Sequence, residues 1–193
     1  MDVARRRPVV YPITIHKKTS MKNVFVIVSA LTALFVAPDL LLAGNFDVEI
    51  HCTPKKVDEQ VKKASDGGAN TTKEHWTYEV TVENKTFKDL PDLNVKYAIF
   101  IKQEQLGVKA APTPKHQTGS FSISSMKPHE KKSFTTDSVE LNKSNLVGNW
   151  IYTSGAKPNA QDTLAGLAVR IYQNGQPFAE YANPSTLSKE KWE

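Results

Sequence analysis

Hydrophobic and polar residues alternate one by one along most of the chain after residue 45. In the clearest stretch, single polar residues such as Glu79 separate Tyr78, Val80 and Val82. Successive side chains of a β-strand point to opposite faces, so this pattern predicts a strand with one buried and one solvated face. The same alternation predicts strands at residues 46–52, 76–83, 95–102 and 164–172, and short apolar runs predict others at 121–123, 134–141 and 150–152.

Polar and turn-forming residues separate these predicted strands. The polar, glycine-containing stretch from Pro54 to Lys73 predicts a loop, with a helical turn at 57–63 as its only regular element. Pro91 predicts an interruption before the strand at 95–102. Asn174-Gly175 predicts a tight hairpin. Seven or eight mostly antiparallel strands, with no long amphipathic helix, predict an all-β sandwich or barrel.

Residues 21–44 have a different composition. A lysine at position 22 precedes an uncharged apolar run from Val24 to Val36, and the segment ends in small residues at 43–44. A basic start, an apolar run of about 7–15 residues and a small-residue exit are typical of a helical secretory signal. An uncleaved membrane anchor is the alternative, although a span of about 20 residues would have to bury a proline and an aspartate.

The remaining boundaries follow from this segment. Residues 1–20 carry five Lys or Arg residues and no apolar periodicity. This favours a translation start at Met21, in which case residues 1–20 are an upstream extension that does not belong to the protein. A long basic signal region, including a twin-arginine signal, is the alternative. We expect residues 45–185 to form the β-domain and residues 186–193 to form a tail with a short helix.

Charge and cysteine content narrow the function classes. Of 25 Lys and Arg and 20 Asp and Glu residues, six and two lie within residues 1–44, which leaves 19 and 18 and a net charge of +1. Arg170 is the only arginine of this remainder, so the domain lacks the basic stripe of a nucleic-acid-binding protein. Cys52 is the only cysteine; we expect it to face inward as a small hydrophobic residue.

Three segments between residues 76 and 141 carry recurring strand and turn motifs. They are Tyr78 to Lys85, with V-x-V-x-N at its end, Leu93 to Tyr97, with L-x-V-x-Y, and Met126 to Thr136, with a P-x-E turn before F-x-T. This order resembles bacterial immunoglobulin-like envelope domains, which implies an immunoglobulin-like sandwich. The chain also resembles small immunoglobulin-like proteins found beside type IV pilus systems in gut bacteria. The cysteine pair and central tryptophan of antibody domains are absent, so the resemblance implies the architecture only.

Motifs for catalysis are weak. Ser124 and Lys127 fit an S-x-x-K spacing, but Pro128 follows and the companion motifs of that nucleophile are missing. The histidines show no i, i+4 spacing of a metal-binding helix, and a two-histidine metal site assembled by folding is the open alternative. We expect no catalytic residues, no bound metal and no cofactor.

Four aromatic side chains are the candidate binding residues: Trp150, Tyr152, Phe178 and Tyr181. Trp150 and Tyr152 share one face of their predicted strand, where an exposed pair would stack sugars or form a protein hot spot. Filling the edge of the core is the alternative. Pro177 cannot donate to a ladder and predicts an edge strand. We expect a protein partner, or a second copy of the chain, to contact residues 177–181 or 150–152.

Together these features predict an exported, non-enzymatic module of the cell envelope that serves binding, adhesion or assembly. It would reside in the periplasm, at the outer membrane surface or outside the cell, with membrane contact only through an uncleaved signal. A carbohydrate-binding module with an aromatic platform is the first alternative. A hydrolase whose histidines and carboxylates meet in one cleft on folding is the second.

The signal segment gives a direct prediction. Signal peptidase should cut near residues 43–45, because small residues end the apolar run there. Mass spectrometry of the protein from its native host should find the mature N-terminus at this position. A cytoplasmic protein that begins at residue 1 would contradict export.

Overall fold

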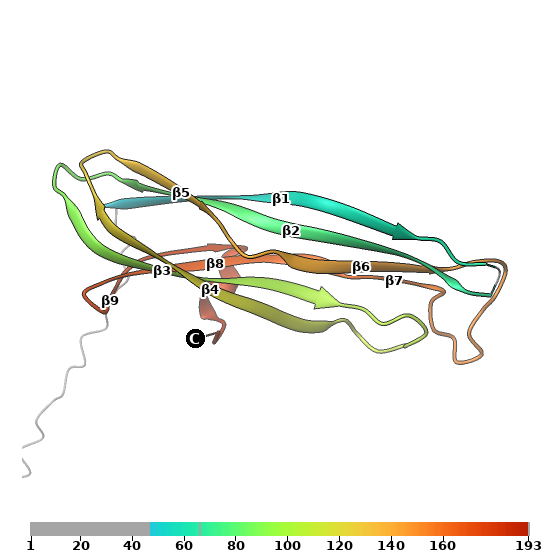
Figure 1. Cartoon of the computed structure of the whole chain (residues 1–193). Coiled ribbons are helices and arrows are strands. Elements are labelled where there is room, and N and C mark those ends of the chain that lie inside the picture. Colours follow the sequence, from blue (N-terminus) through green and yellow to red (C-terminus); the bar gives the residue numbers. More distant parts are fainter. Residues whose placement is uncertain (1–46, 66, 193) are drawn as a thin grey trace, which may run out of the picture. The chain divides into compact units, whose positions relative to one another are not determined.

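The computed structural model describes residues 47–65 and 67–192, which form two antiparallel β-sheets packed face to face (Figure 1). The predicted segments 1–20 and 21–44 lie outside the described residues. Sheet A has the strand order β1 (Val48–Lys62), β2 (Ala69–Asn84), β6 (Val139–Leu146) and β7 (Asn159–Gln161); β5 (Lys131–Thr135) pairs with the end of β2 that β6 leaves uncovered. Sheet B has the order β4 (Thr113–Met126), β3 (Leu90–Gln103), β8 (Thr163–Gln173) and β9 (Gln176–Asn183). The predicted all-β sandwich is confirmed.

One hydrophobic core fills the space between the sheets. The rows that alternate in the sequence supply it, and burying apolar surface is the main favourable term in such a fold. Its fully buried members include Val80 and Val82 of β2, Val95 and Ile99 of β3, and Leu167, Val169 and Ile171 of β8. The predicted Asn174-Gly175 hairpin joins β8 to β9 with both turn residues at positive φ, 51° and 76°.

The prediction of a loop from Pro54 to Lys73 is wrong. β1 continues to Lys62 and β2 begins at Ala69, so most of this stretch is a long hairpin. Residues 54–63 are exposed, and with water on both sides the strand has no apolar face to mark it. Ion pairs across the strands, including Lys56–Glu74 at 2.8 Å, take the place of hydrophobic contacts.

Several other boundaries differ from the prediction. The described residues form nine strands, because the expected strand at 134–141 is divided into β5 and β6 and the short strand β7 was not predicted. Thr136 causes this break: its Oγ1 accepts a hydrogen bond from the Tyr78 amide at 2.9 Å, and its own amide donates to the Tyr78 carbonyl. Pro91 lies inside β3 rather than before it, opposite Ser125. Residues 150–152 form no strand, and the C-terminal helix is a 3₁₀ turn, η1 (Ser185–Lys189).

The chain crosses from one sheet to the other at Asp162. β7 pairs in sheet A, β8 pairs in sheet B, and the single residue between them is buried. Its Oδ1 accepts a hydrogen bond from the Glu104 amide at 3.0 Å, and its Oδ2 accepts one from the Asn142 amide at 2.9 Å. The carboxylate therefore joins the end of β3 to β6.

The C-terminal segment covers the outer face of sheet B. Trp192 is buried against Ala98, Phe100 and Ala168, and the Arg170 guanidinium lies 4.6 Å from its ring centroid. Gly166 permits the close approach: a β-carbon there would lie 2.1 Å from the Asn183 carbonyl oxygen. This face is consequently more apolar than the alternation in β3 predicts.

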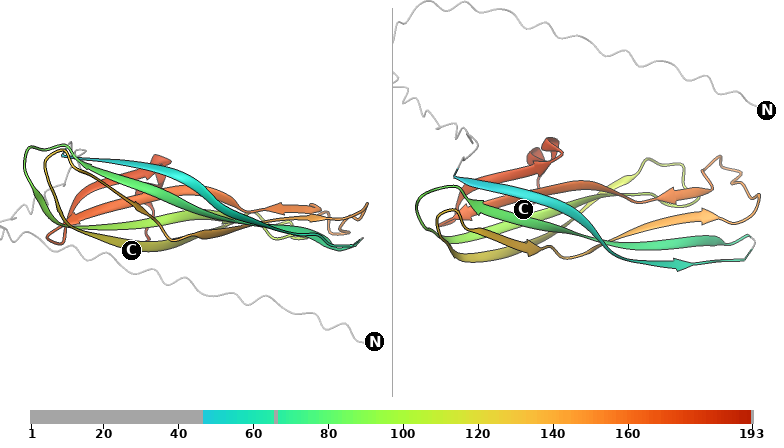
Figure 2. Two further views of the ribbon diagram at one scale, coloured as in Figure 1. Left: turned by 45° about the horizontal axis from the view of Figure 1, so that its top comes forward. Right: turned by 90° about the horizontal axis from the view of Figure 1, so that it is seen from above.

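The loops gather at two ends of the domain (Figure 2). We call the end with the β1–β2 turn, the β3–β4 loop and the loop 147–158 the distal end. The opposite, proximal end holds the β8–β9 turn. Within residues 47–65 and 67–192, no helix has the length and apolar character needed to cross a membrane.

Asp162 gives a stability prediction. Asp162→Ala should lower the free energy of unfolding by about 2–4 kcal/mol, because two partly buried amides lose their acceptors. Asp162→Asn keeps one acceptor oxygen and should lie between this variant and the wild type. Urea unfolding measures both. Asp89→Ala, which removes an exposed carboxylate, is the control and should change stability by less than about 0.5 kcal/mol. Equal effects of Asp162→Ala and Asp89→Ala would contradict the role of Asp162.

Candidate binding surface

Large hydrophobic side chains are exposed mainly towards the distal end. Seven are exposed among the described residues, and five of these lie in the distal part of β1, in the β3–β4 loop or in the loop 147–158. We call these five the distal apolar surface: Val57, Val61, Val108, Trp150 and Ile151. Ile151 is 83% exposed and Trp150 is 57% exposed. Exposed apolar residues that gather in one region mark interaction sites more often than single ones do.

The loop 147–158 is held between the two long hairpins. At its start, Val147 donates to the Gly68 carbonyl at 2.9 Å and accepts from the Gly67 amide at 3.3 Å. The Trp150 ring lies beside Gly67, where a β-carbon would be 3.7 Å from the indole Nε1. The Tyr152 ring lies directly on Gly107 of the β3–β4 loop, where a β-carbon would be 2.8 Å from Cε1. The two rings therefore fasten one loop to both hairpins.

A cleft of 480 Å³ lies between the β3–β4 loop and the end of the loop 147–158. Glu104, Lys109 and Lys157 supply its charged groups, and Glu104 Oε2 also accepts a hydrogen bond from the Gln161 amide at 3.1 Å. Among the described residues that line this cleft there is no serine, cysteine or histidine. The cleft offers polar and cationic contacts beside the distal apolar surface.

The structure does not bring the four predicted binding residues together. Trp150 and Tyr152 lie at the distal end, in a loop rather than on one face of a strand, and each contacts a different hairpin. Phe178 and Tyr181 belong to β9 and are partly buried against the core. β9 is an edge strand, as Pro177 predicted. No sequence pattern marked Ile151 or Val57 as a binding residue, because only the fold determines that they are exposed.

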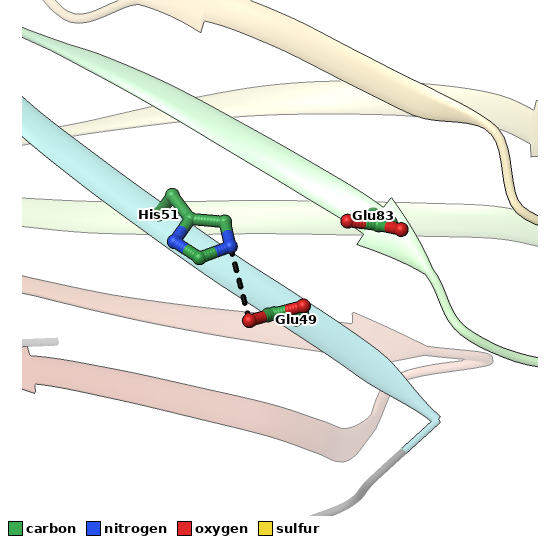
Figure 3. A group of neighbouring side chains, drawn as sticks. All are labelled: Glu49, His51 and Glu83. Carbon is green, nitrogen blue, oxygen red and sulfur yellow. Dashed lines mark ion pairs between the residues drawn. The ribbon is translucent and has the colours of Figure 1, made fainter.

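Glu49, His51 and Glu83 form the one group with the composition of a metal site within the described residues (Figure 3). They project from the proximal parts of β1 and β2, and His51 Nε2 lies 3.1 Å from Glu49 Oε1. The Lys85 ammonium contacts both carboxylates, Glu49 at 2.9 Å and Glu83 at 3.2 Å. A cation would have to displace this ammonium, so the group is an ion-pair network at the start of the sheet.

The lysines set the charge state of this network. The hydrogen bond from Lys85 lowers the pKa of Glu49, and hydrogen bonds from Lys131 and then Lys85 lower the pKa of Glu83. Hydrogen bonds to Glu49 and Glu83 in turn raise the pKa of Lys85. All three groups are thus charged at neutral pH.

A second histidine group crosses the three strands β1, β2 and β6. His75 Nδ1 lies 2.6 Å from Asp58 Oδ1, and its Nε2 lies 3.7 Å from Glu140 Oε2. A hydrolase would need such groups in a cleft that holds the substrate. These three residues lie along the strands of sheet A instead, and none of them lines the distal cleft.

Cys52 lies against the core from β1, facing inward as predicted. Burial raises the pKa of its thiol to about 12. The thiolate is the reactive form of cysteine, so this side chain is protonated and unreactive at neutral pH.

Comparisons with known proteins add little. No protein-family model matches the sequence, and no curated protein matches it. A solved target of the Northeast Structural Genomics Consortium is 10% identical, with a TM-score of 0.38, over 77% of this chain and 96% of that one. A crystal structure from Akkermansia muciniphila is 11% identical, with a TM-score of 0.27, over 78% of this chain and 75% of that one.

The ion-pair network predicts a change in acid stability. A carboxylate whose folded pKa is lowered stabilises the fold above its unfolded pKa, and this stability is lost as the pH falls through the folded pKa. Lys85→Met should therefore make the loss of stability below about pH 4.5 shallower than in the wild type. Urea midpoints between about pH 3 and 6 measure the slope. Lys88→Met removes a lysine that forms no ion pair with any described residue and should keep the wild-type slope. Parallel slopes in all three proteins would contradict the network.

Proposed function

We propose that this chain is an exported, non-enzymatic binding module of the bacterial cell envelope, and that it engages a protein partner through the distal apolar surface. The observation that carries the proposal is the gathering of exposed large hydrophobic side chains towards one end of the sandwich. The signal-like segment at residues 21–44 supports export to the periplasm, the outer membrane surface or the medium.

The construction of the distal end supports protein binding. Trp150 and Ile151 project from a loop that contacts both hairpins, so little freedom of the loop remains to be lost on binding. Removing apolar area from water contributes about 25 cal/mol per Å², and Trp is enriched in the few residues that dominate interface energies. Lys109 and Lys157 in the adjacent cleft add polar contacts at the rim.

We further propose that the domain is immunoglobulin-like and serves adhesion or assembly. The two antiparallel sheets support an immunoglobulin-like domain, together with the strand and turn motifs between residues 76 and 141. We include an adhesion or assembly role beside type IV pili, which would use the same exposed end. An edge strand that pairs with a partner or with a second copy is a further part of the proposal.

A carbohydrate-binding module is the second candidate, and Trp150 favours it. A tryptophan ring that is 57% exposed beside a polar cleft resembles the platforms on which sugar rings stack. In this case the ring face would dominate recognition, and the neighbouring isoleucine would contribute little.

Exchange of one exposed side chain tests the proposal. Ile151→Asp should weaken binding of the partner captured from the host envelope at least tenfold, because a charge replaces an apolar contact. Quantitative cross-linking with mass spectrometry identifies the partner, and titration with the purified partner gives the affinity. Phe87→Asp, which alters an exposed hydrophobic residue outside the distal surface, is the matched control and should bind normally.

The outcomes separate the two candidates. Loss of glycan binding in Trp150→Ala together with unchanged binding in Ile151→Asp would replace the protein partner with a carbohydrate. Equal binding by Ile151→Asp and the wild type, with a protein partner present, would overturn the distal surface as its site.

A further inference from the structure

The open strand edges of this domain are protected unequally. β1 carries Pro54, a bulge near Val57 and a series of charged side chains, and β9 carries Pro177, a bulge and Glu180. β5 and β7 are only five and three residues long. Proline, bulges, charges and shortness are the devices that prevent an edge from pairing with another chain. β4 is the exception.

The β4 edge is long and uncharged. From Gln117 to Ser125 it contains only Gln, Thr, Gly, Ser, Phe and Ile, with no proline and no register shift against β3. β4 borders sheet B beyond β3 (Figure 1), and within the described part of the chain no other strand pairs with it. The Lys132 ammonium donates to the Ser125 carbonyl at 2.7 Å, at one end of this stretch. Between Thr118 and Ser124 the strand itself carries no proline or charge that would oppose the addition of another strand.

Pro114 identifies which backbone groups face outward. It lies opposite Lys102 in the β3–β4 ladder but has no N–H, so this pair cannot exchange two hydrogen bonds. Hydrogen-bonded and non-hydrogen-bonded residue pairs alternate along an antiparallel ladder. The backbone N–H and C=O groups of the even-numbered residues of β4 therefore point away from β3, as far as Ser122. The outward N–H donors are those of His116, Thr118, Ser120 and Ser122.

The opposite side of sheet B gives the same alternation. The two-residue turn Asn174-Gly175 makes Gln173 and Gln176 a hydrogen-bonded pair, so odd residues of β8 bond to β9 and even residues to β3. Even residues of β3 then bond to β8, and odd residues bond to β4. Among the described strands only β3 pairs with β4, so the outward amides of Thr118, Ser120 and Ser122 have no ladder partner.

Cationic and donor groups lie beside this edge. A hollow of 390 Å³ on the outer face of sheet B is lined by Lys96, Trp192, Gly119 and the hydroxyl residues Thr118 and Ser120. The indole Nε1–H of Trp192 is buried and has no acceptor among the described residues. Lys115 and Lys127 flank the uncharged stretch, neither makes an ion pair with any described residue, and β4 itself contains no carboxylate.

We propose that the β4 edge binds an extended, acidic segment of a protein partner as an additional strand of sheet B. The segment's backbone pairs with the outward groups of Thr118, Ser120 and Ser122. Residues of the bound segment that lie opposite Thr118, Ser120 and Ser122 place their side chains on the outer face of sheet B. A Glu or Asp opposite Ser120 therefore reaches across the small serine towards Lys96 and Trp192. The inference rests on the proposed function in so far as the occupant is a protein.

Charge favours this occupant over a second copy of the chain. In a self-paired sheet of two β4 strands, Lys115 and Lys127 would meet no carboxylate of the other strand, because β4 contains none. Like charges across a strand pair are unfavourable. An acidic segment turns the same cations into attractive contacts.

Synthetic peptides test the proposal on the mature protein. The probes are blocked nonapeptides of alternating threonine and valine with one glutamate at successive positions of one face, and matched peptides with lysine instead. Amide hydrogen exchange followed by NMR should show fast exchange at Thr118, Ser120 and Ser122 without peptide, and at least tenfold slower exchange with a glutamate peptide. The lysine peptides should bind at least tenfold more weakly.

A pair of variants at one position isolates the backbone contact. Ser120→Pro removes an outward N–H but no bond to β3, as Pro114 already does further along the strand. It should reduce binding of the glutamate peptide at least tenfold, whereas Ser120→Ala, which keeps the N–H, should bind within about twofold of the wild type. Lys96→Met should abolish the preference for glutamate over lysine. Urea unfolding of each variant confirms that the fold is retained.

Each other outcome overturns the proposal: no protection by any glutamate peptide, protection on β1 or β9 instead, or concentration-dependent protection of β4 without peptide, which would identify a second copy. The result is separable from the proposed function. Peptide binding without partner capture would overturn only the distal surface. Partner capture that depends on Ile151, with no peptide binding at β4, would overturn only the edge.

Discussion

The buried carboxylate of Asp162 fixes how the two sheets meet. A charged group is costly to bury unless hydrogen bonds satisfy it, and here the amides of Glu104 and Asn142 do so from opposite sheets. The chain before Asp162 therefore belongs to sheet A and the chain after it to sheet B. The loop 147–158 enters β7 just before this point, so the position of the distal apolar surface relative to the core depends on the same contact.

The strands are longer than the core that they enclose. Beyond residue 53, β1 is exposed, and the paired part of β2 is only partly buried, so the distal hairpin is held by its ladder and by ion pairs such as Lys56–Glu74. Exposed ion pairs contribute typically 0–1 kcal/mol each. This region consequently lies at the low-stability end of the fold, where local opening is easiest and binding surfaces commonly lie. The contacts of Trp150 with Gly67 and of Tyr152 with Gly107 limit this mobility at the distal apolar surface.

Alternation predicted the parts of the fold that face the core and no others. The rows through Val80 and Val95 could be predicted because one side of each strand must be apolar. Asn174-Gly175 could be predicted because few residues adopt two successive positive φ angles. The distal half of β1 has water on both sides and carries no such signal. The exposure of Ile151, the contacts of Trp150 and the burial of Trp192 depend on segments distant in the sequence.

The unequal protection of the strand edges supports the proposed role of the β4 edge in binding. The side chains of Thr118, Ser120 and Ser122 in β4 are exposed on the outer face of sheet B. A lysine or glutamate would fit at these positions without touching the core. Such a charge would close the edge to other chains at almost no cost in stability. β1 and β9 carry this protection on the same domain, so its absence from β4 does not follow from the sandwich architecture. In the proposed complex, an acidic segment would meet the flanking lysines favourably, whereas a second β4 strand would offer them no carboxylate.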